Sequence, residues 1–173
     1  MTKEELYSIE KYSYSELCSY LIGKYGICDK PYFKKNKNGN LEKTKGKQEL
    51  CLHRHHVYEN EIPNLSNIDV AKEYDLKYQK AENLVYCNLL EHFLLHFKIN
   101  QEYDATLGIG GDLYIIRELN DCFFNNIETY SEPIKCLKQE YVRLLKDFYN
   151  LFPQYEHIIC KDSNGNKIEE ISK

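Results

Sequence analysis

The spacing of hydrophobic and polar positions changes several times along the chain, and these changes predict a protein of mixed α and β structure. Apolar residues at helical spacing predict helices in four segments: residues 3–24 (one or two helices), 88–100, 112–124 and 133–151. Two shorter runs with extended character predict strands over 49–59 and 81–87. Asn38-Gly39 is a turn signal between extended flanks, so a hairpin is expected there.

The composition is that of a soluble globular protein, with 42% hydrophobic and 29% charged residues. At this length we expect a single domain over residues 1–173, with an α+β fold. The stretch MTKEELYSIE has no apolar run after a basic start, so no signal peptide is expected, and no apolar run is long enough to cross a membrane. The seven cysteines are scattered without a CxxC pair, which favours reduced thiols. Together these features predict a cytoplasmic protein of a bacterium or of a phage-infected cell.

Charge is distributed unevenly along the chain. The formal net charge is −4, which by itself argues against a nucleic-acid partner. One segment nevertheless has nine basic residues against three acidic ones: Lys24, Lys30, Lys34, Lys35, Lys37, Lys43, Lys45, Lys47 and Arg54 against Asp29, Glu42 and Glu49. Such a segment is suited to bind a polyanion. The alternative is a solvated, lysine-rich hairpin with no binding role.

Five of the six histidines fall into two short stretches, HRHH at residues 53–56 and EHFLLH at residues 91–96. His92 and His96 are four positions apart on a predicted helix, so both side chains project from one face and can share a metal ion. Neighbouring residues on a strand point to opposite faces, but at a twisted strand end His55 and His56 can approach the same cleft. One of them would then complete the metal site, and the other would remain free to accept a proton.

This pattern of histidines, together with Asn83, resembles the HNH nucleases of the ββα-metal superfamily. Their motif has a histidine after a metal-binding residue on the first strand, an asparagine at the second strand, and one or two histidines on the following helix. His55-His56, Asn83 in AENLVYC, and His92 with His96 match these elements in order. The histidine pair and the H-x3-H helix are most similar to the colicin-type nucleases.

The resemblance covers residues 45–100, about a third of the chain, and implies a ββα-metal finger embedded in a mostly helical single domain. Helical regions over 1–26 and 110–155 would flank this finger. The CxxC pairs that hold a structural zinc in many HNH nucleases are absent from the sequence, and the connection from His56 to Asn83 is long.

The resemblance also implies a mechanism of phosphodiester hydrolysis. His56 would accept a proton from the attacking water, and Asn83 would hold the ring of His56 in place. One divalent cation (Mg, Mn, Zn or Ni) would be held by His55, His92 and His96. Contacts to flanking phosphates are expected from four residues: Arg54, Lys34, Lys35 and Lys37. The expected partner is nucleic acid, with DNA as the substrate, and a homodimer is compatible with this mechanism.

Two other classes of function fit the same residues. The histidines could hold a structural zinc in a non-catalytic protein that binds nucleic acid or another protein. The sixteen tyrosines could instead serve an interaction module, such as a phage inhibitor of host defence. His53 is interpreted as an exposed strand residue, with a ligand or phosphate contact as the alternative. Glu59 and Glu91 are expected to be surface charges, with an outer-sphere role as the alternative. GIGG at 108–111 lacks phosphate-loop spacing and predicts a plain turn.

Overall fold

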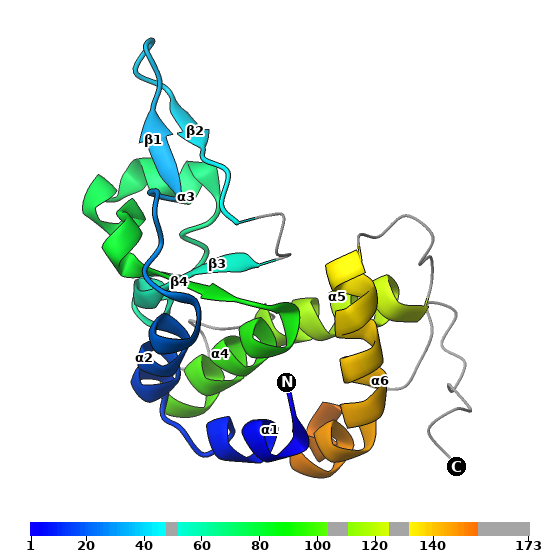
Figure 1. The fold of residues 1–173 in the computed structure, drawn as a ribbon. Coiled ribbons are helices and arrows are strands. Elements are labelled where there is room, and N and C mark those ends of the chain that lie inside the picture. Colours follow the sequence, from blue (N-terminus) through cyan, green and yellow to red (C-terminus); the bar gives the residue numbers. More distant parts are fainter. Residues whose placement is uncertain (48–51, 104–110, 125–131, 156–173) are drawn as a thin grey trace. The chain divides into compact units, whose positions relative to one another are not determined.

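The computed structural model describes residues 1–47, 52–103, 111–124 and 132–155 (Figure 1). The chain divides into two compact units, one formed by residues 12–112 and the other by residues 1–11 together with 113–173. Helices and two small antiparallel sheets are both present, as the predicted α+β class requires. No helix in the described part of the chain combines the length and the apolar character that crossing a membrane requires.

A two-stranded hairpin projects from the unit formed by residues 12–112 (Figure 1). Its strands are β1 (Phe33–Lys35) and β2 (Leu41–Lys43), paired antiparallel. Gly39 adopts a φ of 80° in the turn, a conformation that favours glycine. The side-chain oxygen of Asn36 accepts hydrogen bonds from the backbone amides of residues 38 and 40, which closes the turn. The hairpin predicted at Asn38-Gly39 is therefore present.

The second sheet pairs the two predicted strands. β3 (His53–His56) runs antiparallel to β4 (Leu84–Cys87), so that His53 lies opposite Cys87 and His56 opposite Leu84. The long connection between them contains short helical elements: η2 (Val57–Asn60), α3 (Ile68–Glu73), η3 (Leu76–Gln79) and η4 (Ala81–Asn83).

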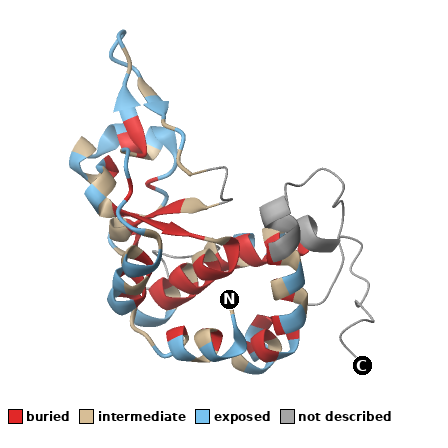
Figure 2. Ribbon diagram, in the orientation of Figure 1, coloured by how far each residue is buried: buried red, intermediate tan, exposed pale blue. Residues whose placement is uncertain are grey.

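The helix α4 (Leu89–Glu102) begins directly after β4. Asn88 and Glu91 form a capping box, which fixes the point at which the chain turns from strand to helix. α2 (Tyr14–Tyr25), capped by Ser13 and Glu16, packs against β4 and α4. Buried residues run along α4 and both strands of the second sheet (Figure 2). These strands and helices form the frame of the candidate site.

The other unit is helical in its described part. It contains α1 (Lys3–Ile9), α5 from residue 113 onward (Gly111–Phe124 in full), α6 (Glu132–Leu151) and η5 (Pro153–Tyr155). The apolar stripe of α6 is buried as its spacing predicts, at Tyr141, Leu144, Leu145 and Phe148. Asp147 receives the hydroxyl of Tyr7 at 3.0 Å and pairs with Lys3 at 2.7 Å, which ties α1 to α6. Most of the GIGG turn lies outside the described residues.

Candidate metal centre

The two faces of β3 have different surroundings. Side chains alternate along a strand, so His53 and His55 share one face and Arg54 and His56 share the other. The ring of His53 lies 5.6 Å, centroid to centroid, from that of His92 on α4. The ring of His55 lies 5.3 Å from that of His92. The face that carries His53 and His55 therefore lies against the histidines of α4.

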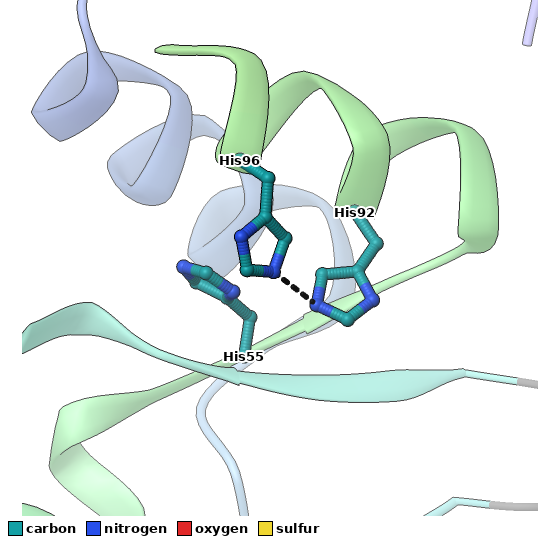
Figure 3. Close-up of side chains that lie close together, drawn as sticks. All are labelled: His55, His92 and His96. Atoms are coloured by element: carbon teal, nitrogen blue, oxygen red, sulfur yellow. Dashed lines mark hydrogen bonds between the residues drawn. The ribbon is translucent and has the colours of Figure 1, made fainter. Parts of the chain in front are cut away.

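His55, His92 and His96 converge at one place, and we call them the histidine triad. Each offers a nitrogen, and the three nitrogens lie within 4.8 Å of one another (Figure 3). The Nε2 atoms of His92 and His96 are 3.2 Å apart. Two nitrogens bound to one tetrahedral zinc, each about 2.0–2.1 Å from it, lie about 3.3 Å apart. The structure thus brings together all three residues that were predicted as ligands, and the separation of His92 and His96 is the one that a tetrahedral ion requires.

The electrostatic state of the triad also suits a metal. Burial lowers the pKa of His55 and His92 well below the usual range for histidine, and it lowers the pKa of His96 to about 4. All three imidazoles are therefore neutral at pH 7, which is the form that coordinates metals. The Nδ1 atom of His55 is buried and has no hydrogen-bond partner among the described residues. A bound cation would satisfy this nitrogen, so the residues fit the predicted cofactor.

Residues from other elements support the triad. The hydroxyl of Tyr14 on α2 lies 2.9 Å from His55 Nε2. Gly111 packs against His96 so closely that a Cβ there would lie 2.3 Å from the Nδ1 of that ring, so only glycine fits. Neither residue belongs to the recognised motif, and both lie far from the triad in sequence. The sequence offered no signal for Tyr14, because sixteen tyrosines are spread over the whole chain.

Glu59 on η2 lies beside the triad and is buried, so the expectation of a surface charge was wrong. Its Oε2 atom is 3.5 Å from His55 Nδ1. Burial raises the pKa of this carboxyl to about 7. The alternative considered for this residue, an outer-sphere carboxylate, is consistent with this position.

Glu91 is also buried, which corrects the second surface-charge expectation. Its carboxylate accepts hydrogen bonds from Lys24 at 2.7 Å and from the hydroxyl of Tyr25 at 3.0 Å. The same side chain caps α4 through the backbone amide of Asn88. Glu91 thus joins α2 to the start of the helix that carries His92 and His96.

His56 lies on the other face of β3 and is fully buried. Its Nε2 is 2.9 Å from Oε1 of Gln79, and its ring centroid is 4.6 Å from that of Tyr32. The amide nitrogen of Gln79 donates to the carbonyl of Leu65 at 3.1 Å, so the Gln79 oxygen faces His56 and accepts from Nε2. The Nδ1 atom of His56 then carries no proton, and it has no partner among the described residues. Burial lowers the pKa of His56 to about 4.

Asn83 does not make the contact that the motif implies. Its amide nitrogen donates to the carbonyl of Lys77 at 2.7 Å, and the side chain that holds the His56 ring is Gln79. Gln79 lies in the same connection, four residues before Asn83. Nothing in the local sequence distinguishes Gln79, because its role depends on how η3 folds back toward β3.

Arg54 was predicted to contact phosphate, and the structure gives it another environment. Its side chain is buried, with the guanidinium 4.7 Å from the ring centroid of Tyr32. It donates to the carbonyl of Pro31 at 3.0 Å, to Oγ1 of Thr44 at 2.8 Å and to the Thr44 carbonyl. Arg54 therefore ties β3 to the base of the hairpin, and its hydrogen bonds are already committed within the protein.

The lysines predicted to contact nucleic acid lie on the hairpin. Lys34 and Lys35 belong to β1, and Lys37 lies in the turn. Lys35 is exposed, and Lys34 is exposed but pairs with Glu42 at 3.0 Å across the two strands. The exposed lysines can meet an anion without unfolding any part of the hairpin, in contrast to Arg54.

Comparisons with protein-family models, with curated proteins and with solved structures give no match for this chain. Assignment to a family therefore remains a proposal that depends on the residues and geometry of the site itself.

Proposed function

We propose that this protein is a metal-dependent endonuclease of the HNH, or ββα-metal, type, which hydrolyses phosphodiester bonds in nucleic acid, with DNA as the expected substrate. One observation carries the proposal. Three neutral imidazoles, from β3 and from the helix that directly follows its partner strand, converge with one nitrogen each within 4.8 Å of the others. The element order of strand, antiparallel strand and helix is the one that the ββα-metal resemblance implies.

The triad would hold the cation and leave part of its coordination shell open. Three protein ligands with a fourth position for water or substrate are typical of catalytic zinc sites. When bound there, a divalent ion would supply Lewis-acid stabilisation of the phosphate and of the leaving oxygen. His55, His92 and His96 are uncharged, so the ion keeps its full positive charge for an anionic substrate.

In this proposal His56 is the general base that accepts the proton of the attacking water. Gln79 holds the ring through Nε2–H, which leaves the lone pair of Nδ1 as the acceptor. His56 is fully buried, so the side chains around Nδ1 must move for water to reach it. His53 is the competing acceptor, because it is partly exposed and lies on the same strand face as His55.

The exposed lysines of the hairpin, Lys34, Lys35 and Lys37, would contact phosphates of the substrate away from the scissile bond. Such contacts supply affinity without sequence preference and make binding sensitive to salt. The net charge of −4 does not exclude such contacts, because the projecting hairpin itself has four lysines (Lys34, Lys35, Lys37 and Lys43) against one acidic residue, Glu42.

A second candidate function is a closed, structural metal site in a non-catalytic binding protein. The observation that favours it is Glu59, whose buried Oε2 lies 3.5 Å from His55 Nδ1. Two ligands of one tetrahedral ion have nearly this separation, so a small movement of Glu59 toward the triad could fill the fourth position. Four protein ligands would leave no place for water or a phosphate.

One experiment separates the two candidates. Supercoiled plasmid is incubated with purified protein, with and without EDTA, across Mg, Mn, Ni and Zn, and the Glu59→Gln variant is assayed in parallel. The endonuclease proposal predicts nicked or linear plasmid in at least one metal and none with EDTA. The structural-site proposal predicts no cleavage in any metal, together with a rise in melting temperature on metal addition that Glu59→Gln reduces.

A further inference from the structure

We infer that Tyr14 is a positioning residue for the metal centre: its hydroxyl holds His55 in the tautomer that carries hydrogen on Nε2, so that Nδ1 is the ligand atom. This inference depends on the histidine triad being the metal site of the proposed function. It extends the site beyond residues 45–100, because Tyr14 begins α2.

The hydrogen bonds of the Tyr14 hydroxyl decide the tautomer. The oxygen lies 2.9 Å from His55 Nε2, 3.2 Å from the carbonyl oxygen of His56 and 3.0 Å from that of Val57. A hydroxyl has a single hydrogen, and a carbonyl oxygen can only accept. The Tyr14 hydrogen therefore goes to a carbonyl, and the hydroxyl oxygen is left to accept a hydrogen from the imidazole. Neutral His55 must then be protonated on Nε2 and bare on Nδ1.

The bare nitrogen, Nδ1 of His55, is buried and makes no hydrogen bond among the described residues, and the carboxylate oxygen Oε2 of Glu59 lies 3.5 Å from it. A buried acceptor in this state is unfavourable unless something else binds it, and a cation at the triad would do so. On α4 the paired atoms of His92 and His96 are both Nε2. The proposed coordination shell therefore mixes one Nδ1 ligand from the strand with two Nε2 ligands from the helix.

Tyr14 is itself held rigidly, as a positioning residue must be. Its side chain is buried, and its ring packs edge-on against His55 at 5.9 Å and against Tyr103 at 6.0 Å. Its backbone amide donates to the carboxylate of Glu102 at 2.8 Å, which fixes the start of α2 relative to the end of α4. The hydroxyl consequently has no alternative position that keeps these contacts.

The test removes only the hydroxyl. Tyr14→Phe is compared with wild type and with Tyr103→Phe, a matched control that deletes a hydroxyl with no hydrogen bond in the described part of the chain. Long-range ¹H–¹⁵N spectra of the ion-free proteins report which nitrogen of His55 carries the proton, with the signal assigned by its loss in His55→Ala. Metal affinity is measured separately by competition with a chromophoric chelator, using Zn and Ni.

We expect wild-type His55 to be protonated on Nε2, and Tyr14→Phe to show a mixture of tautomers with metal affinity lowered about 10- to 100-fold. Tyr103→Phe should match wild type in both. A wild-type His55 that is protonated on Nδ1 would overturn the inference, even if Tyr14→Phe fails to fold. Unchanged metal affinity in a folded Tyr14→Phe would overturn it as well. If wild type binds no metal at all, the proposed function fails, while the ion-free spectrum still decides the role of Tyr14.

Discussion

The two faces of β3 differ in how their polar atoms are satisfied. On one face, Arg54 donates to three backbone or side-chain oxygens and His56 donates to Gln79. On the other face, one nitrogen of His55 contacts the Tyr14 hydroxyl, and the other has no hydrogen bond among the described residues and lies beside Glu59 and two more histidines. His55 and His56 are both buried, so the difference between these two residues is not one of exposure.

This contrast shows how a strand of four residues can serve two purposes. Buried polar groups are normally hydrogen-bonded, because a lost partner costs about 1–3 kcal/mol. The Arg54 face follows this rule and joins the sheet to the hairpin. The His55 face departs from this rule at a point where three neutral imidazoles meet, and a departure of this kind is typical of a metal-binding site. His56 combines both features, since its Nε2 is anchored and its Nδ1 is bare.

The largest effect is expected from His56→Ala, which tests whether the face of β3 that carries Arg54 and His56 contributes to catalysis. Loss of a general base lowers the rate about 10²- to 10⁴-fold. Plasmid cleavage under single-turnover conditions measures this, and metal content should remain at the wild-type level. His53→Ala serves as the control, with a much smaller effect expected. A full rate in His56→Ala together with a lost rate in His53→Ala would transfer the proton role to His53.

The second effect concerns the pH dependence of stability. The unfolded chain binds protons at the ordinary histidine pKa near 6.5, whereas His56 and His96 in the folded chain have a pKa of about 4. The contribution of these two residues to the stability of the ion-free protein is therefore full above pH 6.5, falls as the pH drops toward 4, and stops falling below that.

By pH 5 these two residues alone should reduce the free energy of unfolding by about 2 kcal/mol each. Urea denaturation of ion-free Glu59→Gln protein at pH 7, 6 and 5 measures the loss, because the raised pKa of Glu59 would oppose it over the same range. A free energy of unfolding that is constant over this range would mean that the histidines are not buried as neutral rings.

A smaller effect is expected from Arg54→Met, which removes the hydrogen bonds of Arg54 and leaves the triad unchanged. The variant leaves the carbonyls of Pro31 and Thr44 without their charged donor, at a cost of about 2–4 kcal/mol. Thermal denaturation measures the change, and metal affinity should remain unchanged. Lys35→Met removes an exposed cation of the same hairpin and should change stability by less than about 0.5 kcal/mol. A similar loss in both variants would contradict the structural role of Arg54.

The smallest effect is expected at the hairpin, where Lys34, Lys35 and Lys37 are replaced together by Gln. Each lost phosphate contact should reduce the slope of log affinity against log salt by about 0.9 on duplex DNA. Fluorescence anisotropy between 50 and 200 mM salt measures the slope, and turnover at saturation should be largely retained. A charge-matched control replaces three exposed lysines outside the hairpin: Lys72, Lys77 and Lys80. Equal slopes in the two variants would remove the hairpin from the binding surface.

Much of this frame could be predicted from local sequence patterns. Asn38-Gly39 specifies the hairpin turn, and the four-residue spacing of His92 and His96 places both on one helical face. Each signal acts within a single element, so it can be interpreted without knowledge of the rest of the fold. The third proposed ligand, His55, followed from its place in the motif.

The remaining features depend on contacts between elements distant in sequence. Gln79 rather than Asn83 holds His56 because η3 folds back against β3. No periodic pattern in the sequence predicts that η3 lies there. Burial of Glu59 and Arg54 is equally a tertiary outcome, since charged residues are usually exposed. Tyr14 reaches the site only because α2 packs beside α4.

The most direct test of the account is the number of metal ions bound per chain when residues on one or the other face of β3 are replaced. Ion-free wild type, single alanine variants at His55, His92 and His96, and His56→Ala are titrated with Zn and Ni, and bound metal is measured by elemental analysis after desalting. The account predicts about one ion per chain in wild type and in His56→Ala, and a large loss in each triad variant. Absence of metal from wild type, or a loss in His56→Ala equal to that of the triad variants, would contradict it.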